Sequence, residues 1–351
     1  MAKRKPKRKV RKWVIVVMAI LALTLIGIET TLILGFNWKV EWTGTLMPSV
    51  QLKRPTVKVI DLTSNSRPIA VMINNHEYAQ GHHAGLQDAY LVYEIVVEGG
   101  ITRMMAVFKD KDTAKIGSVR SSRHYFLDYA MENDAIYTHF GWSERAMNDI
   151  YSLGIPNVNG LYDSGFWRDT SLDVPYEHTA YTNIASIKEV AEYRGYRMTS
   201  EQKPLLNYQI YPIKMAELEG ASLANHVSIE YSSYQTTSYE YDPTKKVYLR
   251  YTNGMEHHDS EKGGQITAKN IITYQVYNYS FDSYGRQDLD NVGSGSGYYI
   301  SNGYSIPIKW EKNARGEQTK YYYENGEELK VNDGNTFIQI QPVGRELSIT
   351  E

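Results

Sequence analysis

The chain has 351 residues, with 38 Lys and Arg against 40 Asp and Glu, and it contains no Cys. The length exceeds that of one ordinary domain, and the near balance of charge weighs against a nucleic-acid partner, whose binders present a net basic face. Without Cys the chain forms no disulfide and carries no lipobox, so any exported domain depends on packed cores alone.

The N-terminus predicts a membrane anchor. Eight Lys and Arg fall in the first twelve residues, and Val14–Phe36 is a 23-residue segment that is apolar except for Glu29 and three Thr. About 20 apolar residues cross a bilayer, and the basic flank keeps the N-terminus in the cytoplasm. We therefore predict a basic cytoplasmic head over 1–12 and a single-pass transmembrane helix over 13–36.

The alternative is a cleaved signal peptide. Its apolar core usually spans roughly 7–15 residues and ends in a small-x-small cleavage site, and no such site is evident near Ile28–Phe36. Glu29 lies in the outer half of the proposed anchor, where a carboxylate can reach water. Beyond Phe36 the chain has 30 basic against 39 acidic residues, and we expect this part to lie outside the cell.

The rest of the chain predicts a linker and two domains, α+β overall. Residues 37–66, with Pro48 and Pro55, have no sustained periodicity and predict a linker. Residues 67–215 alternate strands with helices, which indicates an α/β domain with a mixed sheet. Residues 226–343 contain short β-rich runs separated by pairs such as Asn253-Gly254, which predicts an antiparallel all-β domain.

One stretch, Tyr93–Trp142, gathers most of the candidate chemistry. Strand-like runs at Tyr93–Val97 and Ile101–Phe108 flank Glu98-Gly99-Gly100, a tight-turn signal. A loop with Ser118, Ser121 and Ser122 follows, and one of these is expected to cap a helix that runs to Met131. A third strand is expected over Ala135–Phe140, and Ser143 is expected to cap the helix that follows it.

Three arginines of this stretch, Arg103, Arg120 and Arg123, are expected to converge near strand ends. Guanidinium groups suit phosphate or carboxylate, and a helix N-terminus adds N–H donors, so we predict an anion site. The alternative is that each arginine pairs with an acid such as Glu94, Glu98 or Asp128. The candidate ligand-binding residues are Arg103, Arg120, Arg123, Asn74, Asn75, Glu98, Tyr137, His139, Arg168 and His178.

No catalytic residue is assigned, because no nucleophile–base–orienter set is evident. If the protein is an enzyme, the candidate bases are Glu94, Asp128 and His139. On one strand Glu94 and Glu98 would lie about 13 Å apart at about 3.3 Å per residue, beyond the roughly 6.5–9.5 Å of inverting glycosidases.

We expect no cofactor and no metal. The groups His76/His82/His83 and His257-His258-Asp259 lack the fixed shell of three or four ligands that zinc needs. The glycine-rich run Gly293–Gly297 predicts a bulged hairpin rather than a phosphate loop, because no helix or Lys follows it.

The chain resembles the YerB-like family of Gram-positive cell-surface lipoproteins, which consist of an N-terminal and a C-terminal domain of unknown function. The resemblance rests on segments that include Arg67–Asn75, Glu98–Arg103, Gly117–Arg123, Phe166–Asp169 and His258-Asp259. It implies an exported two-domain protein of low-GC Gram-positive bacteria and supplies no reaction. The chain departs from the family in lacking the lipobox Cys and in having His82-His83 where Arg-Pro is usual.

We therefore expect a membrane-anchored extracytoplasmic protein, a binding or scaffold module for cell-wall components or envelope proteins. The expected partners are the membrane, through the N-terminal helix, and a wall polymer, an anionic headgroup or an envelope protein, with no nucleic acid. The alternative is an enzyme acting on a phosphate-bearing wall or lipid-linked substrate, with the three arginines as clamps.

Overall fold

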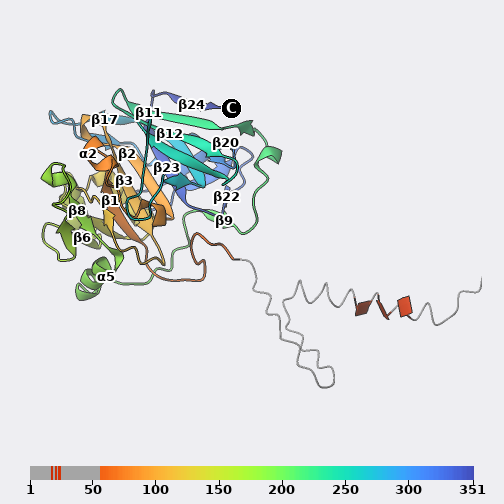
Figure 1. Cartoon of the computed structure of the whole chain (residues 1–351), viewed down its shortest axis with the longest axis horizontal. Helices are drawn as coiled ribbons and strands as arrows, with labels where there is room; N and C mark the ends of the chain where they lie inside the picture. The colour runs from red at the N-terminus through yellow and green to blue at the C-terminus, as the bar shows by residue number, and fades with distance from the viewer. Residues whose placement is uncertain (1–16, 19, 22, 25–55) are drawn as a thin grey trace, which may run out of the picture. The chain divides into compact units, whose positions relative to one another are not determined.

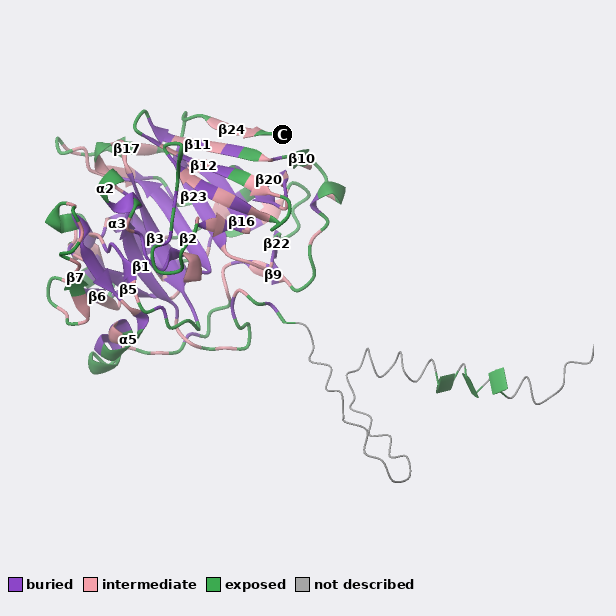
Figure 2. Ribbon diagram, viewed as in Figure 1, coloured by how far each residue is buried: buried purple, intermediate pink, exposed green. Residues whose placement is uncertain are grey.

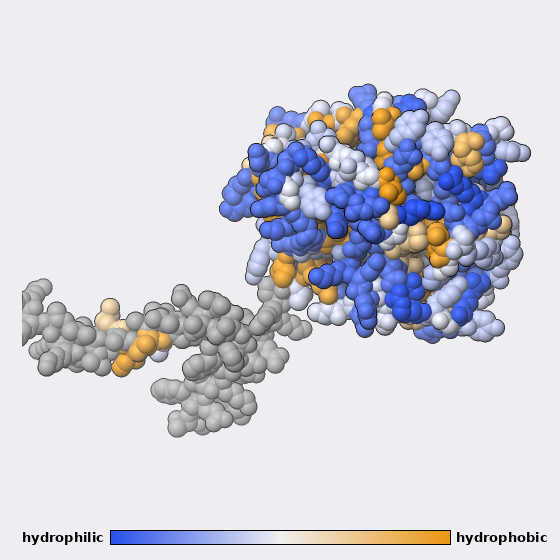
Figure 3. Space-filling model, turned by 180° about the vertical axis from the view of Figure 1, so that it is seen from behind, coloured by the Kyte–Doolittle hydropathy of each residue, from blue (hydrophilic) through white to orange (hydrophobic). Residues whose placement is uncertain are grey.

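The computed structural model describes residues 17–18, 20–21, 23–24 and 56–351 (Figure 1). The predicted head, most of the predicted anchor over 13–36 and most of the predicted linker therefore lie outside the described residues. In the part of the chain that is described, no helix is both long and apolar enough to cross a membrane. Thr56–Glu351 forms one compact unit, and its surface is mostly hydrophilic with separate hydrophobic patches on the face in Figure 3.

The largest sheet has eleven strands, and the strands at its centre are buried along their whole length (Figure 2). In spatial order its strands are β10 (Ser222–Leu223), β20 (Tyr304–Lys312), β19 (Gly293–Ser301), β16 (Asn270–Val276), β23 (Thr336–Pro342), β2 (Leu91–Val96), β3 (Thr102–Phe108), β1 (Ile69–Asn74), β5 (Ile136–His139) and β6 (Asn157–Asn159), with β21 (Lys320–Tyr323) beside β20.

Strand β23 joins the two segments that the sequence predicted as separate domains. It pairs in parallel with β2 on one side and with β16 on the other, so the two segments share one continuous sheet. The predicted antiparallel pairing holds for most strands of the C-terminal segment, but not for β23, which pairs in parallel with β16. Phe337 packs on one face of the sheet while Ile338 and Ile340 pack on the other, and a strand that is apolar on both faces is suited to the centre of a sheet.

A second, antiparallel sheet covers one face of the first. Its strands are β14 (Met255–Glu256), β13 (Val247–Thr252), β12 (Gln235–Asp242), β11 (His226–Ser232) and β24 (Leu347–Thr350), with β15 (Thr267–Ala268) beside β13. Burial alternates along β12 and β13, as expected for strands with one packed face. Tyr231, Tyr239 and Tyr248 point into the shared core with Val71 and Phe337.

Within residues 56–351 the helices are few and short. They are α2 (Glu77–Gln80), α3 (His124–Glu132), α4 (Glu144–Ser152) and α5 (Ile184–Tyr193), with 3₁₀ turns η1 (Leu86–Asp88), η2 (Glu98–Gly100), η3 (Tyr176–His178) and η4 (Met215–Glu217). Helix α3 packs in one core cluster with β2 and β3, and α5 packs in the cluster on the opposite face of the sheet.

The structure confirms one of two predicted serine caps and contradicts the other. Ser143 caps α4, because its Oγ accepts a hydrogen bond from the Ala146 N–H at 3.3 Å. The serine cap predicted for α3 was wrong: α3 begins after Arg123 and has no side-chain cap. Ser122 Oγ instead accepts a hydrogen bond from the Tyr137 hydroxyl at 2.9 Å, so this serine is used in the core.

Three small sheets complete the fold: β4 (Ile116–Gly117), β8 (Ala180–Thr182) and β7 (Phe166–Arg168); β9 (Asn207–Gln209) and β22 (Lys330–Asn332); β17 (Asn278–Ser280) and β18 (Gln287–Leu289). The run Gly293–Gly297 lies in the first strand of the β19–β20 hairpin, but the predicted bulge is absent from it, because the run pairs in regular register with β20. A Cβ at Gly295 would lie 2.8 Å from the Trp310 indole nitrogen, so glycine here makes room for a core tryptophan.

Candidate anion-binding site

The site starts at the turn between β2 and β3. The two strands pair from Leu91↔Val107 to Val96↔Thr102, which confirms the predicted hairpin. Gly99 and Gly100 have φ values of 71° and 72°, a conformation that only glycine adopts without steric cost. The turn exposes Glu98 in part and places it at the same sheet edge as the start of β3, where Arg103 lies beside Asn74.

Glu98 joins two of the predicted arginines. Arg123 donates to both of its carboxylate oxygens, one bond being 2.9 Å from Nη2 to Oε2, and Arg103 Nη2 lies 3.9 Å from Oε2. Burial alone raises the pKa of Glu98, but the Arg123 hydrogen bond and the charges of Arg123 and Arg103 bring that pKa below its usual value. One carboxylate is thus shared between two guanidinium groups.

Arg103 is the most buried of these arginines. Its Nη1 donates to the Ser121 carbonyl at 2.9 Å, while its Nε is buried without a hydrogen-bond partner among the described residues. Burial, and then the positive charge of Arg123, lower its pKa to about 9, against the opposing effect of Glu98. A buried cation with an unused donor is well suited to an additional anion.

Arg120 and Arg168 extend the positive charge. Arg120 Nη1 donates to the Glu177 carbonyl at 2.9 Å, and Arg168 Nη1 donates to the Tyr176 carbonyl at 2.6 Å. Burial lowers the pKa of Arg120, the charge of Glu177 opposes this shift, and the charges of Arg123 and Arg168 add to it. Within residues 56–351 neither Arg120 nor Arg168 forms an ion pair. We call Arg103, Arg120, Arg123 and Arg168 the arginine cluster.

Asn74 and His178 flank Arg120. Asn74 Nδ2 lies 2.6 Å from His178 Nδ1, and the His178 ring centroid lies 4.8 Å from that of His76. Burial lowers the pKa of His178, and the charges of Arg120 and His76 add to this effect. The ring is therefore neutral at pH 7, which leaves the positive charge of this region on the arginines.

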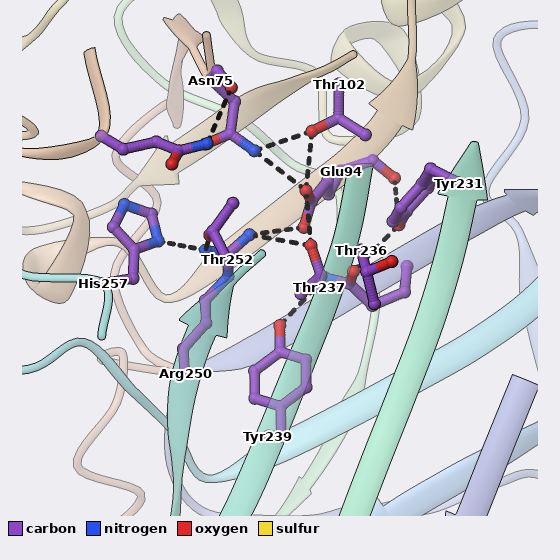
Figure 4. Close-up of polar contacts among 12 residues, drawn as sticks. Asn75, Glu94, Thr102, Tyr231, Thr236, Thr237, Tyr239, Arg250, Thr252 and His257 are labelled. Atoms are coloured by element: carbon purple, nitrogen blue, oxygen red, sulfur yellow. Dashed lines mark hydrogen bonds and ion pairs between the residues drawn. The ribbon is translucent and has the colours of Figure 1, made fainter. Parts of the chain in front are cut away.

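Glu94 and Asn75 do not join the arginine cluster. Glu94 is fully buried and forms an ion pair with Arg250, Nη2 to Oε2 at 2.7 Å (Figure 4). Its Oε1 also accepts hydrogen bonds from Asn75, Thr102 and Thr237 at 3.1, 2.7 and 2.9 Å. A carboxylate surrounded by donors and closed to water is a structural element rather than an accessible base.

Two histidines continue this buried network. A guanidinium can only donate, so Arg250 donates to His257 Nδ1, and the neutral His257 ring donates from Nε2 to His83 Nδ1. His83 Nε2 then donates to the Asn74 carbonyl. Burial, above all, lowers the pKa of His83 to about 4 and that of His257 well below its usual value. We call Glu94, Arg250, His257 and His83 the buried network.

The other predicted bases are also engaged elsewhere. Asp128 accepts from Arg315 Nε at 2.7 Å and from Asn291 Nδ2 at 3.0 Å, and burial raises its pKa to about 6. His139 has both ring nitrogens occupied, by the Gly141 carbonyl at 2.8 Å and by Asn157 at 3.3 Å. Tyr137 is buried, and its hydroxyl donates to Ser122 Oγ just before helix α3.

Arg250 was missed by sequence reasoning, although a signal exists. In β13 the buried positions are Tyr248, Arg250 and Thr252, so the period of two that marks a half-buried strand places Arg250 on the inner face. The two histidine groups were noted, but only the fold brings His83 to His257. In the described part of the chain no group of three or more His, Cys, Asp or Glu is arranged to hold a metal ion.

Comparison with known proteins identifies the class. Family models described as "Protein of unknown function (DUF3048)" match residues 56–197 with the N-terminal domain and residues 227–338 with the C-terminal domain. The chain therefore belongs to the DUF3048 family.

A particular relative is "Putative lipoprotein YerB" of Bacillus subtilis (strain 168), 32% identical over 300 residues that cover 83% of this chain and 87% of the relative. The crystal structure of YerB protein from Bacillus subtilis aligns with a TM-score of 0.71 at 30% identity, covering 85% of this chain and 99% of that chain. The resemblance to the YerB-like family is thereby confirmed, and these relatives carry no reaction in their names.

Proposed function

We propose that the protein works outside the cytoplasm at the cell envelope and binds anionic groups through the arginine cluster. The relative's description as a lipoprotein supports an envelope location. In this proposal residues 13–36 anchor the chain in the cell membrane as a single pass, with the basic head in the cytoplasm and the folded unit outside.

The observation that carries the proposal is an excess of positive charge in the arginine cluster. Four guanidinium groups are accompanied by two acids, Glu98 and the exposed Glu177. The pKa of Glu177 is lowered first by its own backbone hydrogen bond and then by the charges of Arg120 and Arg168. The region therefore carries about two uncompensated positive charges and a buried Nε donor on Arg103. Planar guanidinium forks bind phosphate or carboxylate in pairs of hydrogen bonds.

The ligand chemistry we propose is a phosphate diester, since this group occurs in wall polymers and in lipid headgroups. The geometry favours binding over catalysis. A base for an enzyme would have to lie beside the arginines, whereas Glu94, Asp128 and His139 are each held in other contacts.

The test is calorimetric titration of the full-length protein with poly(glycerol phosphate) and, separately, with phosphatidylglycerol vesicles. Phosphatidylcholine vesicles and uncharged polyglycerol serve as ligand controls. Saturable binding to either anionic probe supports the proposal, and the comparison between the two tells a wall polymer from a headgroup. Binding is expected to weaken as salt rises, because the site is partly open to solvent.

The variant Arg120→Gln removes one charge that no carboxylate balances by an ion pair, and it should weaken binding about tenfold while the fold is kept. Arg345→Gln is the matched control, because Arg345 is exposed and pairs with Glu230 in another part of the molecule. Equal affinity of the two variants, or no binding of the wild-type protein to either probe, would contradict the proposal.

A further inference from the structure

A hollow lies beside helix α4 and contains residues that none of the preceding assignments uses. It is a cavity of about 300 Å³, bounded by the end of α4, the strand β6 and the residues after α5. Its most distinctive lining residues are Trp142, Tyr151, Tyr162, Tyr196, Arg194 and Asn159. Small-molecule sites span roughly 300–1,000 Å³, so the volume suits a single small ring system.

Three aromatic rings form one wall. The Trp142 ring centroid lies 5.9 Å from that of Tyr151 and 5.8 Å from that of Tyr162. Tyr151 and Tyr162 are 67% and 71% exposed, whereas Trp142 is half-buried and is backed by the His139 ring at 5.4 Å. A fixed tryptophan beside two open tyrosines presents flat π faces to solvent, a feature typical of binding surfaces.

The polar residue of the cavity has a fixed orientation and an unused donor. Asn159 Oδ1 accepts from the backbone N–H groups of Gly141 and Leu161 at 3.0 and 3.1 Å. These two donors determine which amide atom is the oxygen, so Nδ2 is the other atom. Asn159 is 1% exposed, and its Nδ2 has no hydrogen-bond partner among the described residues. A buried donor without a partner costs free energy, and a ligand hydroxyl or carbonyl would satisfy it.

The cavity carries no net charge. Its only charged lining residue, among those described, is Arg194, and this guanidinium forms an ion pair with Asp163 and donates to the Asn157 carbonyl at 3.0 Å. The cavity therefore differs from the arginine cluster, where positive charge is in excess. A phosphate or carboxylate would meet no excess positive charge in this cavity, whereas a neutral polar ligand needs none.

We propose that this cavity binds a neutral sugar residue. The axial C–H groups of a pyranose ring carry partial positive charge and pack against the negative faces of Trp and Tyr. The hydroxyl and acetamido oxygens of the sugar supply acceptors for Asn159. This inference is independent of the proposed anion site, because it rests on different residues and on the absence of net charge.

The test is titration of the full-length protein with the neutral oligosaccharide tetra-N-acetylchitotetraose. Binding is measured by tryptophan fluorescence and by calorimetry. Saturable binding is expected. Tyr151→Ala and Tyr162→Ala should each weaken it about tenfold, because each removes one aromatic face. Tyr193→Ala is the matched control, since Tyr193 is 92% exposed on α5 and does not line the cavity.

Both tyrosines are exposed, so these variants are expected to fold, which circular dichroism verifies. Arg120→Gln should bind the oligosaccharide as the wild type does, which separates this inference from the proposed anion site. Absence of saturable binding would overturn the proposal, as would Tyr151→Ala and Tyr162→Ala both binding like Tyr193→Ala. Binding of a proline-rich peptide in place of the sugar would overturn it as well, because extended proline segments also dock on aromatic grooves.

Discussion

The buried network and the arginine cluster use the same kinds of side chain, Glu and Arg, for opposite purposes. Their glutamates, Glu94 and Glu98, are only a few residues apart on one hairpin. In the buried network, Glu94 and Arg250 are both fully buried, and Glu94 also receives hydrogen bonds from Asn75, Thr102 and Thr237. In the arginine cluster, Glu98 is shared between Arg103 and Arg123 at the edge of the sheet, and positive charge is in excess.

The difference lies in the ratio of charges and in access to water. In the Glu94–Arg250 pair one positive charge balances one negative charge, and both side chains are closed to water. The pair therefore holds the second sheet against the first, and it presents no net charge to a ligand. The arginine cluster has an excess of positive charge and is partly open to water, which is why we propose it, and not the buried network, as the anion site. Three predictions test this comparison.

The largest effect is expected in the buried network. Arg250→Met leaves the Glu94 carboxylate buried without its partner, which should lower the free energy of unfolding by about 3–5 kcal/mol. Urea denaturation measures this loss, and Arg345→Met, an exposed pair, should change stability by less than about 1 kcal/mol. Adding Glu94→Gln to Arg250→Met should recover part of the lost stability. Similar stabilities of Arg250→Met and Arg345→Met would contradict the distinction between the buried and the exposed ion pair.

The next effect is a dependence of stability on pH that arises from the buried histidines. The folded-state pKa of His83 is lowered to about 4 by burial, whereas an unfolded histidine titrates near 6.5. The unfolded chain therefore binds more protons between these values, and stability that is fully present above pH 6.5 is lost as pH falls toward 4.

The loss attributable to His83 is on the order of 3 kcal/mol. Urea midpoints between pH 7 and pH 4 measure it, and His83→Gln should flatten this slope relative to the wild type. His82→Gln is the neighbouring control, because the partly exposed His82 side chain lies outside the network. If all three proteins gave the same slope, His83 would not be neutral in the folded state.

The smallest effect is expected at Glu98. Glu98→Gln removes the carboxylate shared by Arg103 and Arg123, so it increases the positive charge of the arginine cluster. Binding of poly(glycerol phosphate) should tighten by about threefold, while stability falls by about 1 kcal/mol. Glu177→Gln, at the other acid of the region, should tighten binding less because Glu177 is exposed. Weaker binding of Glu98→Gln would show that Glu98 orients the arginines rather than neutralising them.

The candidate site was only partly predictable. The turn at Gly99-Gly100 and the spacing of Arg120 and Arg123 indicated a gathering of arginines, and the structure brings these residues together with Glu98 and Arg103. The sequence placed Glu98 in the turn and Glu94 in the strand, but it did not show that Glu94 is fully buried and paired with Arg250. Their separation depends on β2 ending at Val96, which turns Glu98 into the loop while Glu94 faces the second sheet.

The sequence by itself determined local features: the β2–β3 hairpin, from its glycine pair; the start of α4, from Ser143; the alternating strands of the second sheet; and the family. These depend on backbone conformation and on side-chain periodicity, which neighbouring residues control. Only the tertiary structure decided that β23 pairs with β2, that Arg250 meets Glu94, and that Trp142 and Asn159 line one cavity. Contacts of this kind join residues that are separated in the sequence. They form because of burial and hydrogen bonding in the complete fold, so no single segment of the sequence predicts them.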